Sequence, residues 1–298
     1  MMLIMFKLKK GDKVAIVAPS GQIGGKEPIE KALAYLQSLG LEPIFGQHLF
    51  KQNRYMAGSD ADRAADINAA FANPEIKTIF CARAAAGATR ILPLIDYNTA
   101  RQNPKPLVGF CDNAALMTAL WQKSGIASLN GFLLTYDFKN GAPTDLVKTQ
   151  FESWLSGKAP LFKSGTCVQA GTARGTLLPI NLSVLMRLAG TPYFPDLRDT
   201  ILILEDVHER VHKIDLMLEH LKQQPNFDKI NGLIFGQFTD SSGDDEDGSV
   251  DDCVADFLQG IDAPVIKNFA FGHVLARHVL PFGEKVKMNA QKTLLTMI

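Results

Sequence analysis

The sequence predicts a two-domain α/β protein whose first domain contains a mostly parallel sheet. The chain has 298 residues, a length that suggests roughly two domains. In its first half, short β-rich runs alternate with amphipathic helical patterns, an order that is typical of βαβ units and therefore of parallel strands. In the second half, strand patterns are more frequent than helical ones. That half is expected to form a smaller, β-rich α+β domain.

The first strand and the first helices have recognisable ends. Residues 14–18 are apolar and β-rich, and the run stops at a Pro-Ser-Gly turn. Apolar residues then recur at helical spacing over residues 26–39, and Gly40 supplies a stop. Ser59, placed before two aspartates, predicts the N-terminus of a helix that ends near residue 73. Further strands are expected at residues 43–45, 78–82 and 107–110, and further helices at 89–95, 114–123 and 145–155.

A crossing between the two domains is expected over residues 161–174. A Ser-Gly-Lys-Ala-Pro stretch precedes this segment, and glycine is frequent within it and just after it. The N-terminal domain then covers residues 1–160, and the C-terminal domain covers residues 175–298. The elements expected in the C-terminal domain are helices at 182–188 and 214–223 and strands at 201–204, 233–235, 286–288 and 294–297.

Composition and charge exclude several classes of protein. The 31 basic residues balance 31 acidic ones, which gives no basis for a nucleic-acid partner. No apolar run approaches the roughly 18 residues that a membrane-spanning helix needs. Apolar residues 1–6 precede several lysines, the reverse of a secretory signal, and the four cysteines contain no C-x-x-C pair. We therefore expect a cytoplasmic protein with no membrane or nucleic-acid partner and no thiolate zinc site.

Residues 107–113, Leu-Val-Gly-Phe-Cys-Asp-Asn, carry the most informative chemistry. An apolar strand there meets the start of a helix, and Cys111 lies at the junction. This arrangement resembles a nucleophile elbow, in which a sharp turn exposes the nucleophile and the first helix amides can bind an oxyanion. Gly109 provides clearance two residues earlier. The alternative is that Cys111 is a small buried residue at a strand end, a common environment for a lone cysteine.

Two other segments raise the question of metal binding. His208, Glu209 and His212 match the pattern H-E-x-x-H, which on a helix holds zinc between two imidazoles with the glutamate as base. A zinc hydrolase is therefore an alternative function, and the competing interpretation is a polar connection before the helix at residue 214. The acidic run at residues 244–247 does not follow EF-hand spacing, so it is interpreted as a solvated loop.

A series of short motifs extends along nearly the whole chain. In the first half they are Val17-Ala18-Pro19-Ser20-Gly21, Ala57-Gly58-Ser59-Asp60, Arg63-Ala64, Asp66-Ile67-Asn68, Ile95-Asp96-Tyr97 and Asn103-Pro104-Lys105. In the second half they are Gly190-Thr191-Pro192-Tyr193, Leu204-Glu205-Asp206-Val207, Ile214-Asp215, Phe235-Gly236, Phe271-Gly272-His273, Leu280-Pro281 and Gly283. In this order, the motifs resemble the LD-carboxypeptidase family, which includes muramoyltetrapeptide carboxypeptidases and the microcin C self-immunity proteins.

The resemblance implies a fold and a catalytic triad. It implies a Rossmann-like N-terminal domain and a smaller C-terminal domain, usually in a homodimer, with a Ser-His-Glu triad between the domains. The matching positions in this sequence are Cys111, His273 and Glu205. Cys111 would be the nucleophile, His273 the base and then the acid for the leaving group, and Glu205 would orient the imidazole.

The resemblance also implies a substrate and the residues that bind it. Members hydrolyse an amide between an L-centre and a D-residue, typically releasing the terminal D-alanine of a peptidoglycan tetrapeptide during cytoplasmic wall recycling. Backbone amides near Ala85 and Asp112 would donate to the oxyanion, and Arg83 would lie beside the terminal carboxylate of the substrate. The implied partner is therefore a small peptide or muropeptide, and no metal or other cofactor is implied.

Three departures from the family pattern fall on the predicted site. Cys111 stands where the family has serine, residues 83–87 read Arg-Ala-Ala-Ala-Gly instead of Arg-Gly-Gly-Tyr-Gly, and residues 179–182 read Pro-Ile-Asn-Leu instead of Gly-Gly-Asn-Leu. Alanine at a position with positive φ would cost on the order of 1 kcal/mol or shift an oxyanion-binding amide. Two functions therefore stay open: a cysteine peptidase with an altered pocket, which the retained Glu205 and His273 favour, and a catalytically silent homologue that binds a muropeptide or related ligand.

Overall fold

The structure, a computed structural model, describes residues 7–244 and 247–298 and consists of two compact units. The first unit extends to Pro160 and also includes Val279–Gly283, and the second comprises Leu161–His278 and Glu284–Ile298. This division differs from the expected one in two places. Residues 161–174 contain strands of the second sheet instead of a crossing between domains. Residues 279–283, which were expected in the C-terminal domain, belong to the first unit. Both differences involve strands whose partners are distant in the sequence, so local patterns do not reveal them.

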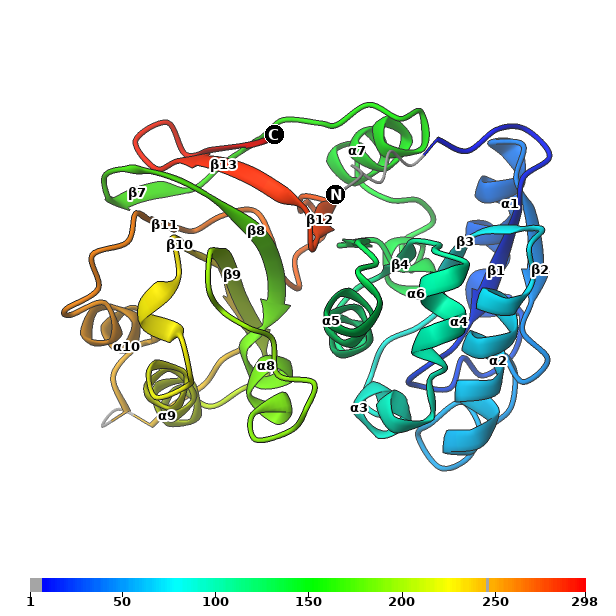
Figure 1. Ribbon diagram of the computed structural model, residues 1–298, viewed down its shortest axis with the longest axis horizontal. Coiled ribbons are helices and arrows are strands. Elements are labelled where there is room, and N and C mark those ends of the chain that lie inside the picture. Colours follow the sequence, from blue (N-terminus) through cyan, green and yellow to red (C-terminus); the bar gives the residue numbers. More distant parts are fainter. Residues whose placement is uncertain (1–6, 245–246) are drawn as a thin grey trace. The chain divides into compact units, whose positions relative to one another are not determined.

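The first unit contains a six-stranded sheet in the order β12-β5-β4-β3-β1-β2, parallel except for β12 (Figure 1). Its strands are β1 (Lys13–Val17), β2 (Glu42–Phe45), β3 (Ile76–Cys81), β4 (Leu107–Gly109), β5 (Ser128–Asn130) and β12 (Leu280–Phe282). Its helices are α1 (Glu30–Ser38), α2 (Asp60–Ala72), α3 (Ala88–Ile91), α4 (Tyr97–Gln102), α5 (Asn113–Ser124), α6 (Leu134–Asp137) and α7 (Asp145–Leu155). The predicted parallel α/β arrangement of this half is confirmed.

The start of α2 shows how local sequence defines an element. The Ser59 hydroxyl accepts a hydrogen bond from the Asp62 amide, and the Asp62 carboxylate accepts one from the Ser59 amide, both at 3.1 Å. This capping box satisfies two amide groups that the first turn leaves free. The expected helix start is therefore correct. In contrast, β5, α4 and α6 are short and were not expected from the sequence.

The order of the first sheet places a topological switch between β1 and β3. The chain moves from β1 to the edge strand β2 and then returns past β1 to β3, β4 and β5. At such a point the loops after the two central strands diverge, and open α/β sheets bind ligands in the crevice beside those carboxyl ends. The loops that follow β1 and β3, residues 18–22 and 82–88, therefore mark a preferred position for a site.

The second unit contains an eight-stranded mixed sheet in the order β6-β14-β13-β8-β9-β10-β11-β7. Its strands are β6 (Phe162–Lys163), β7 (Thr166–Gln169), β8 (Thr172–Asn181), β9 (Thr200–Val207), β10 (Gly232–Thr239), β11 (Val265–Lys267), β13 (Lys285–Asn289) and β14 (Leu294–Met297). Its helices are α8 (Leu182–Leu188), α9 (Val211–Lys222) and α10 (Val250–Phe257). Strands β8 to β11 are parallel, and antiparallel strands flank them on both sides. The sequence had indicated only part of this parallel core, because β8 and β11 were not expected.

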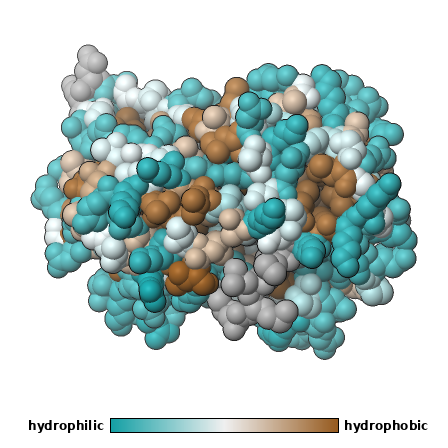
Figure 2. All heavy atoms as spheres, turned by 90° about the horizontal axis from the view of Figure 1, so that it is seen from above, coloured by the Kyte–Doolittle hydropathy of each residue, from teal (hydrophilic) through white to brown (hydrophobic). Residues whose placement is uncertain are grey.

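The described residues include no helix that is long and apolar enough to cross a membrane. In the face shown in Figure 2, polar side chains surround separate apolar patches. Inside the first unit, the Phe132 and Phe151 rings stack with their centroids 3.9 Å apart, and Phe80 meets both rings edge-on. Such close aromatic packing is typical of a well-formed core.

Candidate active site

Cys111 occupies a sharp turn between β4 and α5. Its φ is 59°, in the left-handed region that residues other than glycine rarely adopt. Its side chain is half-buried, whereas Cys81 on the neighbouring strand β3 is fully buried, and burial raises the pKa of the Cys81 thiol far above its usual range. Cys111 is therefore not the buried residue at a strand end that the alternative interpretation supposed. Its backbone has the strained strand-to-helix geometry of a nucleophile elbow.

Gly109 is closely packed beneath this turn. A Cβ atom added there would lie 3.1 Å from the Asn113 Cβ and 3.2 Å from both the Cys81 Sγ and the Met117 Cε. Real Cβ atoms rarely come this close to several neighbours at once. The predicted role of Gly109 in giving clearance thus has a structural basis, although the clearance concerns the helix and strand behind the turn.

Asp112 follows Cys111 at the N-cap position of α5, and its side chain is almost fully buried. Its Oδ2 accepts hydrogen bonds from the Ser20 hydroxyl at 2.6 Å and from the Ala88 amide at 2.8 Å. Ser20 belongs to the loop after β1, and Ala88 begins α3 after the loop that follows β3. The Asp112 carboxylate therefore joins three loops at the carboxyl edge of the sheet, a role that the sequence analysis did not assign to it.

The loop at residues 83–87 contains Arg83 and the three alanines that depart from the family pattern, Ala84, Ala85 and Ala86. Ala84, Ala85 and Ala86 all lie outside the left-handed region, whereas Gly87 has a φ of 133°. The alanines therefore cause none of the backbone strain that was considered possible. Arg83 is half-buried, and its Nη1 donates to the Gln22 carbonyl at 2.8 Å. Ala85 is exposed.

In the second unit, Glu205 and His273 form a direct pair. Glu205 lies on β9 with a fully buried side chain, and its Oε2 is 2.9 Å from the Nδ1 of His273. Burial raises the pKa of Glu205, while the hydrogen bond to His273 acts in the opposite direction. A buried carboxylate that holds Nδ1 selects the tautomer in which Nε2 can exchange a proton.

Two glycines make room for this pair. A Cβ added at Gly272, whose φ is 128°, would lie 3.0 Å from the Glu205 Oε2, and one at Gly236 would collide with the Phe271 carbonyl. The ladder between β9 and β10 is irregular beside Gly236, and the Gln237 amide donates to the Phe271 carbonyl at 2.8 Å. This irregularity holds the segment before His273 against Glu205, which explains the Phe-Gly and Phe-Gly-His motifs.

The H-E-x-x-H segment does not form the helical geometry that the zinc interpretation requires. Helix α9 begins at Val211, whereas His208 has a φ of 60° and an exposed side chain. Within residues 7–244 and 247–298, no three His, Cys, Asp or Glu side chains are grouped so that they could hold a metal ion. His212 instead approaches Asp247, its Nδ1 3.3 Å from the Oδ2. Residues 245–246 of the acidic run lie outside the described residues.

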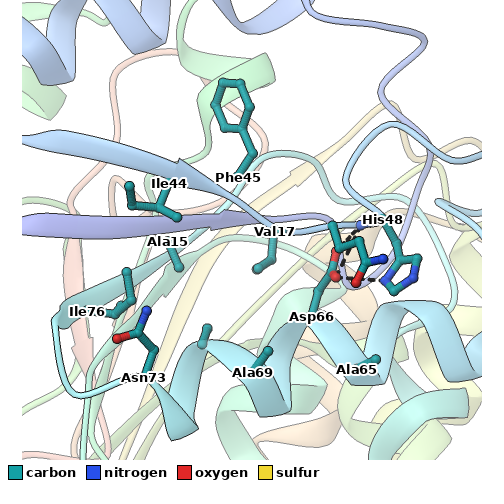
Figure 3. Close-up of a pocket in the computed structure, with 13 residues that line it drawn as sticks. Ala15, Val17, Ile44, Phe45, His48, Ala65, Asp66, Ala69, Asn73 and Ile76 are labelled. Carbon is teal, nitrogen blue, oxygen red and sulfur yellow. Dashed lines mark hydrogen bonds and ion pairs between the residues drawn. The ribbon is translucent and has the colours of Figure 1, made fainter.

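A cavity of about 240 Å³ lies between α2 and strands β1 and β2 (Figure 3). Alanines and other apolar side chains form most of its wall, with Asp66 and His48 at one end and Asn73 at the other. The Asp66 Oδ1 is 2.8 Å from the His48 Nδ1, and the Oδ2 accepts a hydrogen bond from the His48 amide at 3.0 Å. None of the predicted site residues lines this cavity. Asp66 thus fixes the loop after β2.

A cysteine in elbow geometry and a buried carboxylate–histidine pair are features that also occur in hydrolases that use a nucleophile, a histidine and an acid. Comparison with known proteins gives the family. Residues 14–131 match the LD-carboxypeptidase N-terminal domain, and residues 174–288 match the LD-carboxypeptidase C-terminal domain. The chain belongs to the LD-carboxypeptidase family.

Three relatives illustrate this membership. A probable murein peptide carboxypeptidase of Bacillus subtilis is 31% identical over 297 residues, which cover 96% of this chain and 92% of that protein. The structure of muramoyltetrapeptide carboxypeptidase from Oxalobacter formigenes has a TM-score of 0.85 at 26% identity, covering 95% and 97% of the two chains. The structure of MccF in complex with glutamyl sulfamoyl guanosine has a TM-score of 0.87 at 21% identity, covering 98% and 97%, and it supports the fold.

Proposed function

We propose that this protein is an LD-carboxypeptidase that uses a cysteine nucleophile and releases the terminal D-alanine from a murein tetrapeptide. The observation that carries the proposal is the left-handed backbone of Cys111 at the junction of β4 and α5. A non-glycine residue in this conformation costs roughly 1 kcal/mol or more, and such strain is concentrated at functional sites. The elbow thus points to a reactive thiol at this position.

The proposed reaction proceeds through an acyl-enzyme. The Cys111 thiol transfers its proton to the Nε2 of His273 as its sulfur attacks the carbonyl carbon of the L,D amide. The amides of Ala85 and Asp112 donate to the oxyanion, and collapse of the adduct breaks the C–N bond while His273 returns the proton to the departing D-alanine nitrogen. Water, deprotonated by His273, then hydrolyses the thioester and regenerates the thiol.

Two further residues complete the proposed site. Glu205 orients the imidazole and stabilises its protonated form, as its contact with Nδ1 supports. Arg83 binds the terminal carboxylate of the substrate, a task suited to a guanidinium that is half-exposed and already oriented by the Gln22 carbonyl. The unstrained backbone of the alanine-substituted loop favours this active interpretation over a silent homologue.

The proposal also includes a cytoplasmic location and a homodimer. The four cysteines lie far apart in the sequence with no C-x-x-C pair, which suits a reducing compartment. Size-exclusion chromatography with light scattering should give twice the 32.6 kDa mass of the chain. A monomeric mass would contradict the homodimer without affecting the chemistry proposed for Cys111.

The deciding experiment measures D-alanine release from a murein tetrapeptide by the parent protein, Cys111→Ser and Cys111→Ala. Release by the parent and none by Cys111→Ala is expected. An all-L peptide of the same length serves as the substrate control and should not be cleaved. Undiminished release by Cys111→Ala would contradict the nucleophile assignment. Binding of the tetrapeptide without release by the parent or by Cys111→Ser would show the silent homologue instead.

A further inference from the structure

We infer that Arg63 and Asp112 form a loop clamp, a pair of buried side chains that holds the oxyanion-binding loop at residues 83–88 against the nucleophile elbow. In this view Arg63 and Asp112 are positioning residues, because they act through the backbone of the loops. The inference rests on the proposed function for its effect on catalysis, but the clamp itself is visible in the contacts of the first unit.

Arg63 joins the loops after β1 and β3 through their carbonyl groups. It lies on α2 with a fully buried side chain, and its Nη1 donates to the Pro19 carbonyl at 2.6 Å and to the Gly87 carbonyl at 2.8 Å. Nη2 pairs with the Asp60 carboxylate. A buried guanidinium needs hydrogen-bond acceptors, and here Nη1 and Nη2 have them, whereas the buried Nε has none. If the Pro19 and Gly87 carbonyl groups moved apart, Nη1 of Arg63 would lose one of its two hydrogen-bond acceptors.

Asp112 joins the same two loops through their donor groups. Its Oδ2 accepts from the hydroxyl of Ser20, the neighbour of Pro19, and from the amide of Ala88, the neighbour of Gly87. In each loop, Arg63 and Asp112 therefore bind adjacent residues. Arg63 donates to the carbonyl groups of Pro19 and Gly87, and Asp112 accepts from the next residue in each loop. Burial lowers the pKa of Arg63, and the Asp60 and Asp112 carboxylates oppose this shift. The two halves of the clamp thus also support each other electrostatically.

Additional contacts show how tightly the two loops meet. A Cβ added at Gly21 would lie 2.6 Å from the Ala85 Cβ and 3.2 Å from the Ala84 carbonyl oxygen. The clamp holds both sides of this contact at the switch point of the sheet, where the carboxyl ends of β1 and β3 diverge. Because the Asp112 backbone directly follows Cys111, its side chain ties the 83–88 loop to the residue beside the nucleophile.

We therefore expect loosening of the clamp to affect acyl transfer but not the alkylation of Cys111. Oxyanion stabilisation needs the Ala85 and Asp112 amides at fixed positions, so loosening the clamp should slow acyl transfer. Alkylation of Cys111 by iodoacetamide needs no oxyanion donor, so it should proceed as before. A purely structural role would give no such separation, because loss of the fold affects both reactions together.

The test compares Ser20→Ala and Asp112→Ala with Asp66→Ala as a matched control. Asp66 is also buried and also accepts a loop amide, that of His48, but its loop holds no proposed site residue (Figure 3). For the clamp variants, kcat for D-alanine release should fall by about 10- to 1000-fold with little change in KM. In Ser20→Ala, which leaves the charge beside Cys111 unchanged, the rate of Cys111 alkylation, followed by peptide mass mapping, should stay at the parent value. Asp66→Ala should keep the parent kcat even if its unfolding midpoint falls.

Ser20→Ala removes only one hydroxyl and therefore keeps the test usable if Asp112→Ala fails to fold. Equal losses of kcat in Ser20→Ala and Asp66→Ala would overturn the inference, because both effects would then reflect stability alone. If the parent releases no D-alanine, the proposed function fails, and hydrogen–deuterium exchange then tests the clamp. Faster exchange confined to residues 19–22 and 83–88 in Ser20→Ala supports the clamp, and unchanged exchange there overturns it.

Discussion

The Nδ1 of His273 lies 2.9 Å from the Oε2 of Glu205, although 68 residues separate them in the chain. The carboxylate is fully buried, and the imidazole is 13% exposed. Because the contact uses Nδ1, the acid–base chemistry available to His273 is confined to Nε2. The first prediction concerns this pair.

Glu205→Gln should reduce D-alanine release by roughly 10³- to 10⁴-fold, because the neutral amide no longer stabilises the imidazolium. Burial raises the pKa of Glu205 in the folded state above its ordinary value of 4.5. As pH rises above 4.5, Glu205 therefore loses its proton in the unfolded chain before it does so in the folded protein. The free energy of unfolding falls over this range, until the pH passes the pKa of Glu205 in the folded state. Glutamine does not titrate. In urea unfolding, the free energy of unfolding of the variant minus that of the parent should therefore be larger at pH 8 than at pH 4. Glu219→Gln, an exposed change on α9, should show neither effect.

His278 should make the protein sensitive to mild acid. Burial lowers the pKa of His278 from 6.5 to about 4, and its Nε2 lies 3.1 Å from the Ser164 Oγ beside the Phe269 ring. As pH falls below 6.5 the unfolded chain binds a proton that the folded state does not, so about 3 kcal/mol of stability should be lost by pH 4. His278→Gln should flatten this dependence in urea unfolding. A variant with the parent's slope between pH 6.5 and 4 would contradict the prediction, and His220→Gln, an exposed substitution, is the control.

The strain at Cys111 should be measurable as a difference between two substitutions. Cys111→Gly should be more stable than Cys111→Ala by about 1 kcal/mol, because glycine adopts a φ of 59° without a steric cost. At Cys81, which lies in the ordinary extended backbone of β3, the order should be reversed. The free energies of unfolding of the four variants test the relation. Equal stabilities at position 111 would show that the elbow holds no strain.

Zinc removal should leave hydrolysis unchanged. His208 precedes α9 and His212 lies within it, so the two imidazoles do not share a helix face. Activity after dialysis against a chelator, and the activities of His208→Ala and His212→Ala, should equal those of the parent. Inhibition by chelator that added zinc reverses would instead support the zinc interpretation.

Several features of this protein followed from short segments of sequence. The alternation of strand and helix patterns predicted the parallel sheet of the first unit, and the Ser59 capping box marked the start of α2. The position of Cys111 between an apolar run and a helix predicted the elbow. The bounds of α7 and α8 were also correct. These features depend on neighbouring residues, whose periodicity and capping preferences act locally.

Other features depended on contacts between distant segments. The sequence did not show that β12 would join the first sheet, that β6 and β7 would belong to the second, or that Ser20 would donate to Asp112 across 92 residues. The H-E-x-x-H pattern was misleading because β9 continues to Val207 and the chain turns at His208 before α9 begins.

The sequence by itself determined the order of most elements, the place of Cys111 between an apolar strand and a helix, and the family motifs, because each is encoded in adjacent residues. Tertiary structure alone decided the φ of Cys111, the unstrained conformation of Ala84–Ala86 and the partners of the buried Arg63, Asp112 and Glu205. The physical reason is that a buried charge or a strained backbone persists only where surrounding segments hold it in place. Which segments those are is established only when the chain folds.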